Sequence, residues 1–188
     1  MSTPPLDQLV LASGPVGEAA DRLLAGHNAG HLSLGRPAWA VVLAALARRC
    51  GQPLLVVPAR DEEARDLVTD LEALLGPLAV ALWPSRGAVS GGAVGISPHL
   101  VGLRARALGV LGAPGRVVVA STPALMERVP ARDVRADEVV LEPGMRIDMD
   151  ALVDRLAGVG YERVPQVEER GEMAVRGGLL DVYPSTAD

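Results

Sequence analysis

The first two thirds of the chain switch between short uninterrupted apolar runs and apolar residues at helical spacing. The runs predict buried strands and the spaced positions predict helices. Strands are expected at 31–34, 53–58, 78–83 and 116–121, and helices at 16–25, 38–50, 61–75, 99–111 and 123–129. This order predicts an α/β domain over residues 1–130, with a mostly parallel sheet and flanking helices joined by right-handed crossovers. Residues 1–15 are rich in proline and are expected to form a loose lead-in.

A second, small α+β domain is expected over residues 137–188, with residues 130–136 as the boundary. It begins with a strand at 137–141 and a helix capped by Asp148. Alternating residues then predict strands at 161–168, 172–176 and 179–183, separated by a turn at Arg170-Gly171 and a kink at Gly177-Gly178. The strands are expected to form an antiparallel sheet with one apolar face and one face that carries arginines.

The charge and composition of the chain disfavour several classes of binding and catalysis. The net charge is -5, which does not indicate a general nucleic-acid binder, since such domains are basic. The sequence contains no lysine, so it has no phosphate-loop lysine, Schiff base or lysine general base. Phenylalanine is also absent, and the core must consist mainly of Leu, Val and Ala.

The strand, glycine turn and helix around Gly35-Arg36-Pro37 follow the layout of a phosphate-binding loop. A working loop has several glycines, a lysine and a hydroxyl residue. This one has a single glycine, a proline without an N–H group and the bulky Trp39, so it is interpreted as degenerate. An anion held by Arg36 at the helix N-terminus is the alternative.

Other candidate sites favour structural roles. His27 and His31 lack a third metal ligand at a suitable spacing, and the acids of 61–63 are typical of a helix start. The glycine-rich stretch 84–95 is expected to be a mobile connection, with phosphate binding as the alternative. A single cysteine, Cys50, fits a reducing interior as a small buried residue. No metal, cofactor or membrane span is expected, and the sequence pattern favours a cytoplasmic protein.

Residues 160–184, G-Y-E-R-V-P-Q-V-E-E-R-G-E-M-A-V-R-G-G-L-L-D-V-Y-P, resemble the N-terminal region of the bacterial transcription-repair coupling factors, which is similar to the front of UvrB. Weaker agreement reaches back to about residue 31. The resemblance implies a UvrB-like first domain with a degenerate, non-hydrolysing phosphate loop. It also implies that the small second domain docks onto UvrA.

The sequence departs from the family pattern at two places. The family motif W-E-T-L-P is absent after Trp83, so any contact made there by relatives is in doubt. In the family, a further strand completes the small domain beyond this point. The resemblance therefore implies a truncated small domain with an open sheet edge that invites pairing.

The resemblance also suggests partner-binding residues. Arg176 and Arg163 match arginines of the family pattern, and a guanidinium fork suits partner carboxylates. If both are central to an interface, losing either should cost about 2 kcal/mol of binding. The alternative is that they are solvated arginines that balance nearby glutamates. The remaining candidates, for which core packing or a solvated position is equally open, are Arg170, Glu172, Met173 and Tyr161.

The function expected from this resemblance is a non-catalytic interaction module that recruits UvrA in nucleotide excision repair. RNA polymerase and DNA would be contacted only by other parts of a full-length, ATP-dependent translocase. The alternative is a nucleotide-binding or hydrolysing α/β domain, which the missing lysine disfavours. A third possibility is an α/β scaffold that holds a DNA-binding or regulatory partner.

Overall fold

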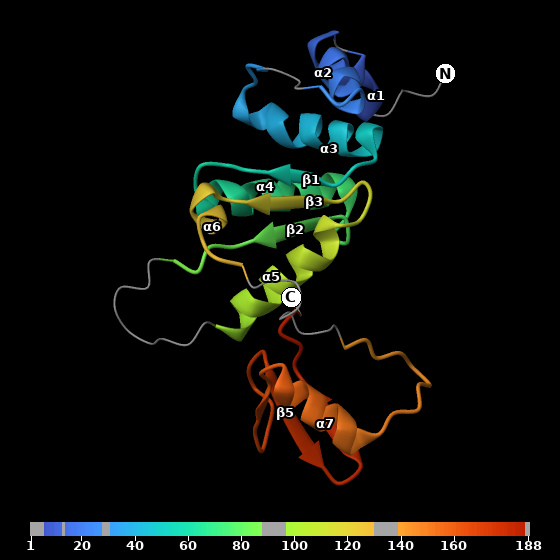
Figure 1. Ribbon diagram of the computed structural model, residues 1–188, viewed down its shortest axis with the longest axis vertical. Coiled ribbons are helices and arrows are strands. Elements are labelled where there is room, and N and C mark those ends of the chain that lie inside the picture. Colours follow the sequence, from blue (N-terminus) through green and yellow to red (C-terminus); the bar gives the residue numbers. More distant parts are fainter. Residues whose placement is uncertain (1–5, 13, 28–30, 88–96, 130–138, 187–188) are drawn as a thin grey trace. The chain divides into compact units, whose positions relative to one another are not determined.

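A computed structural model of the chain describes residues 6–12, 14–27, 31–87, 97–129 and 139–186 (Figure 1). The chain forms two compact units. The first comprises residues 1–88 and 103–127, and the second comprises residues 89–102 and 128–188.

The first unit is an α/β domain around a three-stranded parallel sheet of order β1-β3-β2. Its strands are β1 (Leu54–Val56), β2 (Val80–Trp83) and β3 (Val117–Ala120). Its helices are α1 (Leu6–Leu11), α2 (Gly14–Leu24), α3 (Trp39–Cys50), α4 (Asp61–Leu75) and α6 (Thr122–Leu125), with a short 3-10 helix at Arg36–Ala38. The helix α5 (Pro98–Leu111) contributes its residues from Leu103 onward. The predicted α/β class and parallel sheet are confirmed.

The central strand β3 is buried along its whole length because helices cover both faces of the sheet beside it. Val117 and Val119 face α3 and α4, and α4 lies behind the strands in Figure 1. Val118 and Ala120 face α5 and α6 on the other side. The helix residues at these contacts are mostly small, which lets the helices approach the sheet closely. They are Ala40, Ala44, Ala47, Ala64, Ala107 and Ala124.

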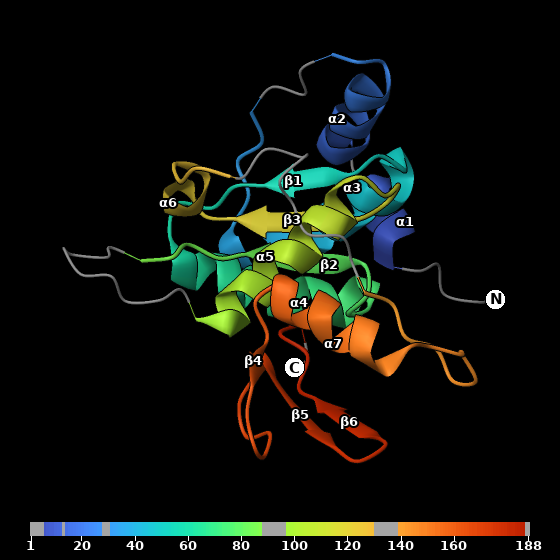
Figure 2. The ribbon, with the colours of Figure 1, turned by 60° about the horizontal axis from the view of Figure 1, so that its bottom comes forward.

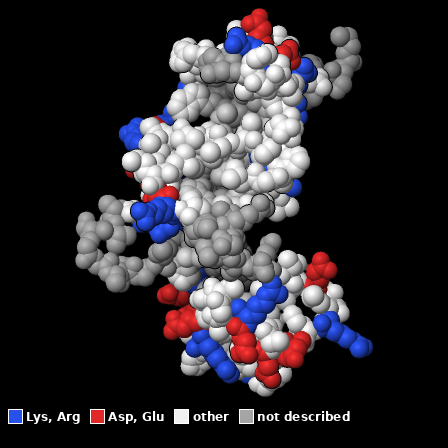
Figure 3. Space-filling view, in the orientation of Figure 1, with Lys and Arg blue, Asp and Glu red and all other residues white. Residues whose placement is uncertain are grey.

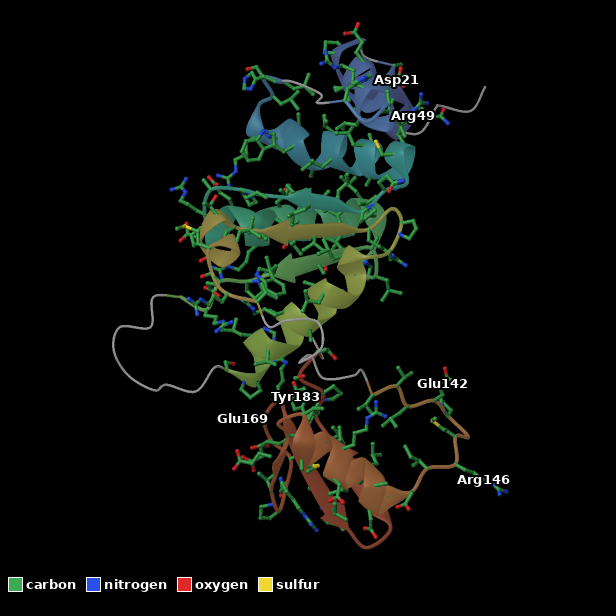
Figure 4. The ribbon with its side chains drawn as sticks, viewed as in Figure 1. Asp21, Arg49, Glu142, Arg146, Glu169 and Tyr183 are labelled. Carbon is green, nitrogen blue, oxygen red and sulfur yellow. The ribbon has the colours of Figure 1, made fainter. Side chains whose placement is uncertain are left out.

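The first two helices pack on α3 around Val16, Ala20, Val42 and Leu46. An ion pair between Asp21 and Arg49, with 2.9 Å between Oδ1 and Nη2, joins α2 to α3 at the surface (Figure 4). The prediction of a loose lead-in is therefore wrong for the described residues from 6 to 15. This stretch contains α1 and the first turn of α2, where Pro15 is compatible with a helix start.

Two further expectations for this unit are wrong. Residues 31–34 form no strand, because the Leu34 carbonyl accepts the Trp39 indole N–H at 3.1 Å and the Leu34 side chain packs beside α1 to α3. The strand β1 is not covered on both faces, since Leu55 is half exposed. An apolar run alone does not say whether a strand is central or at an edge.

The second unit packs the helix α7 (Met149–Gly158) on the strands β4 (Glu162–Arg163), β5 (Glu172–Arg176) and β6 (Leu179–Val182). Figure 2 shows the three strands, which lie in the order β4-β5-β6. Leu152 and Leu156 of α7 bury Met173 of β5. Asp148 caps α7 as predicted, with its Oδ1 accepting the amide of Asp150 at 3.0 Å.

Strand pairing in this unit differs from the expected antiparallel sheet. β5 and β6 are antiparallel as expected, but they form a hairpin that turns at Gly177-Gly178, where a kink was expected, and Gly177 has a positive φ of 59°. In contrast, β4 contains only two residues and pairs with β5 in parallel. Oε2 of Glu172 accepts hydrogen bonds from the amides of Glu168 and Glu169, each at 2.7 Å. These bonds shape a loop where a turn at Arg170-Gly171 was expected. Residues 139–141 form no strand, and positions 137–138 of that expected strand lie outside the described residues.

Candidate functional site

The outer face of the β5–β6 hairpin, opposite α7, gathers six residues by strand register. Cross-strand partners point to the same face of a sheet. By register, this docking face carries Glu172 and Arg176 on β5 and Leu179, Asp181 and Tyr183 on the β6 side, around Ala174, which is only 1% exposed. Figure 3 shows charged side chains of both signs over the second unit, whereas the visible face of the first unit is largely uncharged. The second unit thus presents charged groups of both signs to solvent.

Arg176 lies at the turn end of the docking face. One of its Nη2 hydrogens is donated to Asp181 Oδ2, and both side chains are substantially exposed, at 62% and 45%. Asp181 is the only partner of Arg176 among the described residues. A guanidinium has five N–H donors, so Arg176 can bind a second carboxylate while it remains paired with Asp181.

Arg170 and Glu172 shape the other end of this face. The Arg170 guanidinium lies 5.5 Å from the centre of the Tyr183 ring, within range of a cation–π interaction; Tyr183 is labelled in Figure 4. The two amides that Glu172 accepts, from Glu168 and Glu169, hold the pKa of the Glu172 carboxyl below its usual value. Both residues therefore have a structural role in ordering the loop beside β5.

Met173 and Tyr161 face the interior of the unit. Met173 is 1% exposed and contacts Leu152 and Leu156 of α7. The Tyr161 ring packs against the same cluster, and its hydroxyl accepts the Ser185 amide at 3.0 Å. Of the two readings that the sequence leaves open, core packing is the one found for both.

Arg163 and Arg176 do not share a face. Arg163 pairs with Met173, so its side chain belongs to the α7 side of the sheet, whereas Arg176 belongs to the docking face. Both are exposed. The expectation of a single arginine-bearing face is therefore wrong for these two residues, because the register places Arg163 opposite Met173.

Sequence reasoning did not select Leu179, which the hairpin places directly opposite Arg176. It is 68% exposed although it is a leucine on a strand. The signal in the sequence was the two-residue Gly177-Gly178 turn, which sets the register that pairs Leu179 with Arg176.

The loop at Gly35-Arg36-Pro37 makes contacts within the first unit. Gly35 precedes the 3-10 helix, Pro37 lies inside it, and Arg36 Nη2 lies 3.2 Å from Asp66 Oδ2. Both charged side chains are mostly exposed. Arg36 therefore already has a carboxylate partner and adds no unpaired positive charge beside the start of α3.

A cluster of polar residues lies where the parallel strands of the first unit end. Asp61 accepts hydrogen bonds from the hydroxyls of Ser121 and Ser85, the latter at 2.9 Å, and the Ser121 bond is the main cause that lowers the Asp61 pKa. Glu127 accepts the Arg104 Nη1 hydrogen at 2.6 Å and the Arg86 amide at 2.7 Å. Most of these groups pair with one another and join the strand ends, although Arg104 Nη2 is buried without a hydrogen-bond partner among the described residues.

Candidates for metal binding and reactive chemistry find little support in the described part of the chain. No group of three His, Cys, Asp or Glu residues there is arranged to hold a metal. Burial raises the pKa of the Cys50 thiol, which disfavours a reactive thiolate. Among the described helices, none combines the length and apolar character needed to span a bilayer.

Residues 139–188 match the family model of the UvrB interaction domain. The second unit, which carries the docking face, therefore contains a domain of a protein-interaction family. The chain is 31% identical over 173 residues to the transcription-repair-coupling factor of Bacillus subtilis, covering 89% of this chain and 14% of that protein. The corresponding protein of Mycobacterium tuberculosis is 37% identical over 172 residues, 87% of this chain and 14% of its own length.

The transcription-repair-coupling factor of Myxococcus xanthus is 33% identical over 183 residues, which cover 93% of this chain and 15% of the relative. The chain therefore belongs to the transcription-repair-coupling factor family. It spans about one seventh of the length of these relatives.

Proposed function

We propose that the docking face binds UvrA and that the chain thereby recruits UvrA to stalled transcription in nucleotide excision repair. The observation that carries the proposal is Arg176, an exposed guanidinium on the outer face of a UvrB interaction domain with donors left for a partner carboxylate. Contacts with RNA polymerase and DNA, and the ATP-dependent movement, belong in this proposal to parts of the longer relatives that the chain does not match.

The proposed role is binding without catalysis. The sequence has no lysine for a phosphate loop, and Arg36 is paired with Asp66 beside the start of α3. The titratable cluster at Asp61 and Glu127 is held by its own hydrogen bonds. These observations support a scaffold role for the first unit, with the UvrB-like relationship and the degenerate loop as part of the proposal.

The test is a calorimetric titration of UvrA into the wild-type chain and into Arg176→Ala. We expect the variant to bind at least tenfold more weakly, a loss of about 1.4 kcal/mol or more. The matched control is Arg146→Ala, which removes an exposed arginine of the same unit from the segment before α7 (Figure 4). Circular dichroism must show that all the chains are folded.

Arg163→Ala adds a second comparison, because Arg163 belongs to the opposite side of the sheet. A UvrA surface that contacts only the docking face leaves this variant at wild-type affinity. A loss equal to that of Arg176→Ala means that UvrA reaches around the β4 edge. The proposal fails if the folded wild-type chain does not bind UvrA, or if Arg176→Ala binds as well as the Arg146→Ala control.

A further inference from the structure

We infer that Leu179 is the apolar anchor of the docking face and inserts into an apolar cleft of UvrA whose rim carries the carboxylate that pairs with Arg176. This inference rests on the proposed function and specifies the partner surface that the face fits. It adds an apolar contact to a site that the sequence describes only through charges.

Leu179 leaves most of its apolar side chain in contact with water. A leucine in a strand next to polar neighbours exposes apolar surface to water, at a cost that burial in a partner removes. Leu179 is 68% exposed, compared with 49% for Leu55 at the edge of the other sheet. On the same strand, Leu180 and Val182 turn inward against α7, so the exposure of Leu179 follows from its face.

Leu179 lies beside the charged group of the docking face, Arg176. The two residues are directly paired across the hairpin, and such pairs have Cβ atoms about 5 Å apart. Asp181, on the same strand and the same face as Leu179, holds the Arg176 guanidinium on that face. An apolar side chain flanked by charged groups is the arrangement of an interface core and its rim.

The backbone at Leu179 is held firmly by strand pairing and by packing on α7. The hairpin turn has two residues, and β5 and β6 are paired over four residue pairs. Met173 and Val182 anchor the opposite face of the same strands on α7. Little freedom therefore has to be lost on binding, which favours a small anchor.

Other exposed apolar residues of the second unit provide a comparison. Val140, Leu141, Met145 and Ile147 lie before α7, outside the strands of the sheet. Leu141 is 52% exposed and has no place in the strand register of the docking face. It is the same residue type at similar exposure, so Leu141→Ala is a matched control.

The experiment titrates UvrA into the whole chain as wild type, Leu179→Ala, Leu179→Met and Leu141→Ala. We expect Leu179→Ala to weaken binding about tenfold, because most of an apolar anchor is lost. Leu179→Met keeps an apolar side chain of similar volume and should stay within about threefold of wild type. Leu141→Ala should bind like wild type, and urea unfolding should show equal stability for Leu179→Ala, since the side chain is exposed.

The outcomes separate this inference from the proposed function. If the folded wild type does not bind UvrA, the proposed function itself fails. If wild type binds and Arg176→Ala weakens binding, but Leu179→Ala behaves like Leu141→Ala, only the anchor is refuted. Sedimentation of each variant tests a second copy as the occupant. A Leu179→Ala chain that loses self-association while keeping full UvrA affinity overturns the inference.

Discussion

Replacing Arg104 by methionine should destabilise the first unit by about 2–4 kcal/mol. Arg104 is 7% exposed, and its Nη1 lies 2.6 Å from Glu127 Oε2 and 2.9 Å from the Pro84 carbonyl oxygen. Its guanidinium carbon lies 4.0 Å from the centre of the Trp83 ring. Arg104 thus joins α5 to the end of β2 and to Glu127, two residues after α6.

The magnitude follows from what each group loses. Removing one member of a buried ion pair costs about 3–5 kcal/mol, because the other charge is left without its partner. The cation–π contact with Trp83 adds about 0.5–2 kcal/mol. Two features reduce the total: methionine keeps an apolar stem on the indole, and Glu127 keeps the Arg86 amide at 2.7 Å and is partly exposed.

The assay is urea unfolding followed by tryptophan fluorescence. Both tryptophans of the chain, Trp39 and Trp83, belong to the first unit, so the signal reports on that unit. Arg106→Met on the same helix is the control. Its Nη2 hydrogen bond to the Pro77 carbonyl oxygen is exposed, so we expect a loss below about 1 kcal/mol.

A double-mutant cycle gives the sharper test. Glu127→Gln alone should also destabilise, whereas adding it to Arg104→Met should cost less than the sum of the single changes by about 1–2 kcal/mol. That difference measures the pairing of the two charges. The reasoning is refuted if Arg104→Met unfolds at the same urea concentration as Arg106→Met, or if the two single losses simply add.

Three further results are expected. Met173→Ala should lower the free energy of unfolding by about 2–4 kcal/mol and Met173→Leu by less than about 1.5, measured by urea denaturation; equal stability would mean that Met173 is not core. The lowered Asp61 pKa stabilises the fold above about pH 4, and this stabilisation is lost as the pH falls through the folded-state pKa. Asp61→Asn should therefore flatten the acid side of a stability profile, and an unchanged slope would contradict the role of the Ser121 bond. Gly171→Ala should lower the melting temperature, because φ is +85° and a Cβ would lie 2.7 Å from that of Pro98; Gly178→Ala, with an open surrounding and ordinary φ, should not.

Much of the local structure is present in the sequence. The acids at 61–63 and the Gly76-Pro77 stop predict α4 with the bounds found in the structure. Gly177-Gly178 was expected to be a kink and is the turn between β5 and β6, whereas Asp148 correctly predicts the start of α7. These signals are local because caps, turns and side-chain periodicity involve residues only a few positions apart.

The sequence was weaker wherever a distant contact decided the result. The apolar pattern of residues 31–34 fits a strand as well as the irregular segment that is observed. The segment is irregular because the Leu34 carbonyl accepts the Trp39 indole N–H and the Leu34 side chain packs beside α1 to α3. The helix α1 was not expected, and its residues Val10 and Leu11 pack on the cluster that α2 and α3 form. The periodicity of a short segment does not show whether another helix will bury it.

By itself, the sequence determined the α/β class, most helices and the lack of a phosphate-binding lysine. Only the tertiary structure decided that β4 runs parallel to β5, that Arg163 and Arg176 lie on opposite sides of the sheet, and that Leu179 lies beside Arg176. The physical reason is that alternation has a period of two in parallel and antiparallel strands alike. The direction of pairing therefore depends on the path of the chain between strands, which the carboxylate of Glu172 helps to shape by binding two amides of the loop.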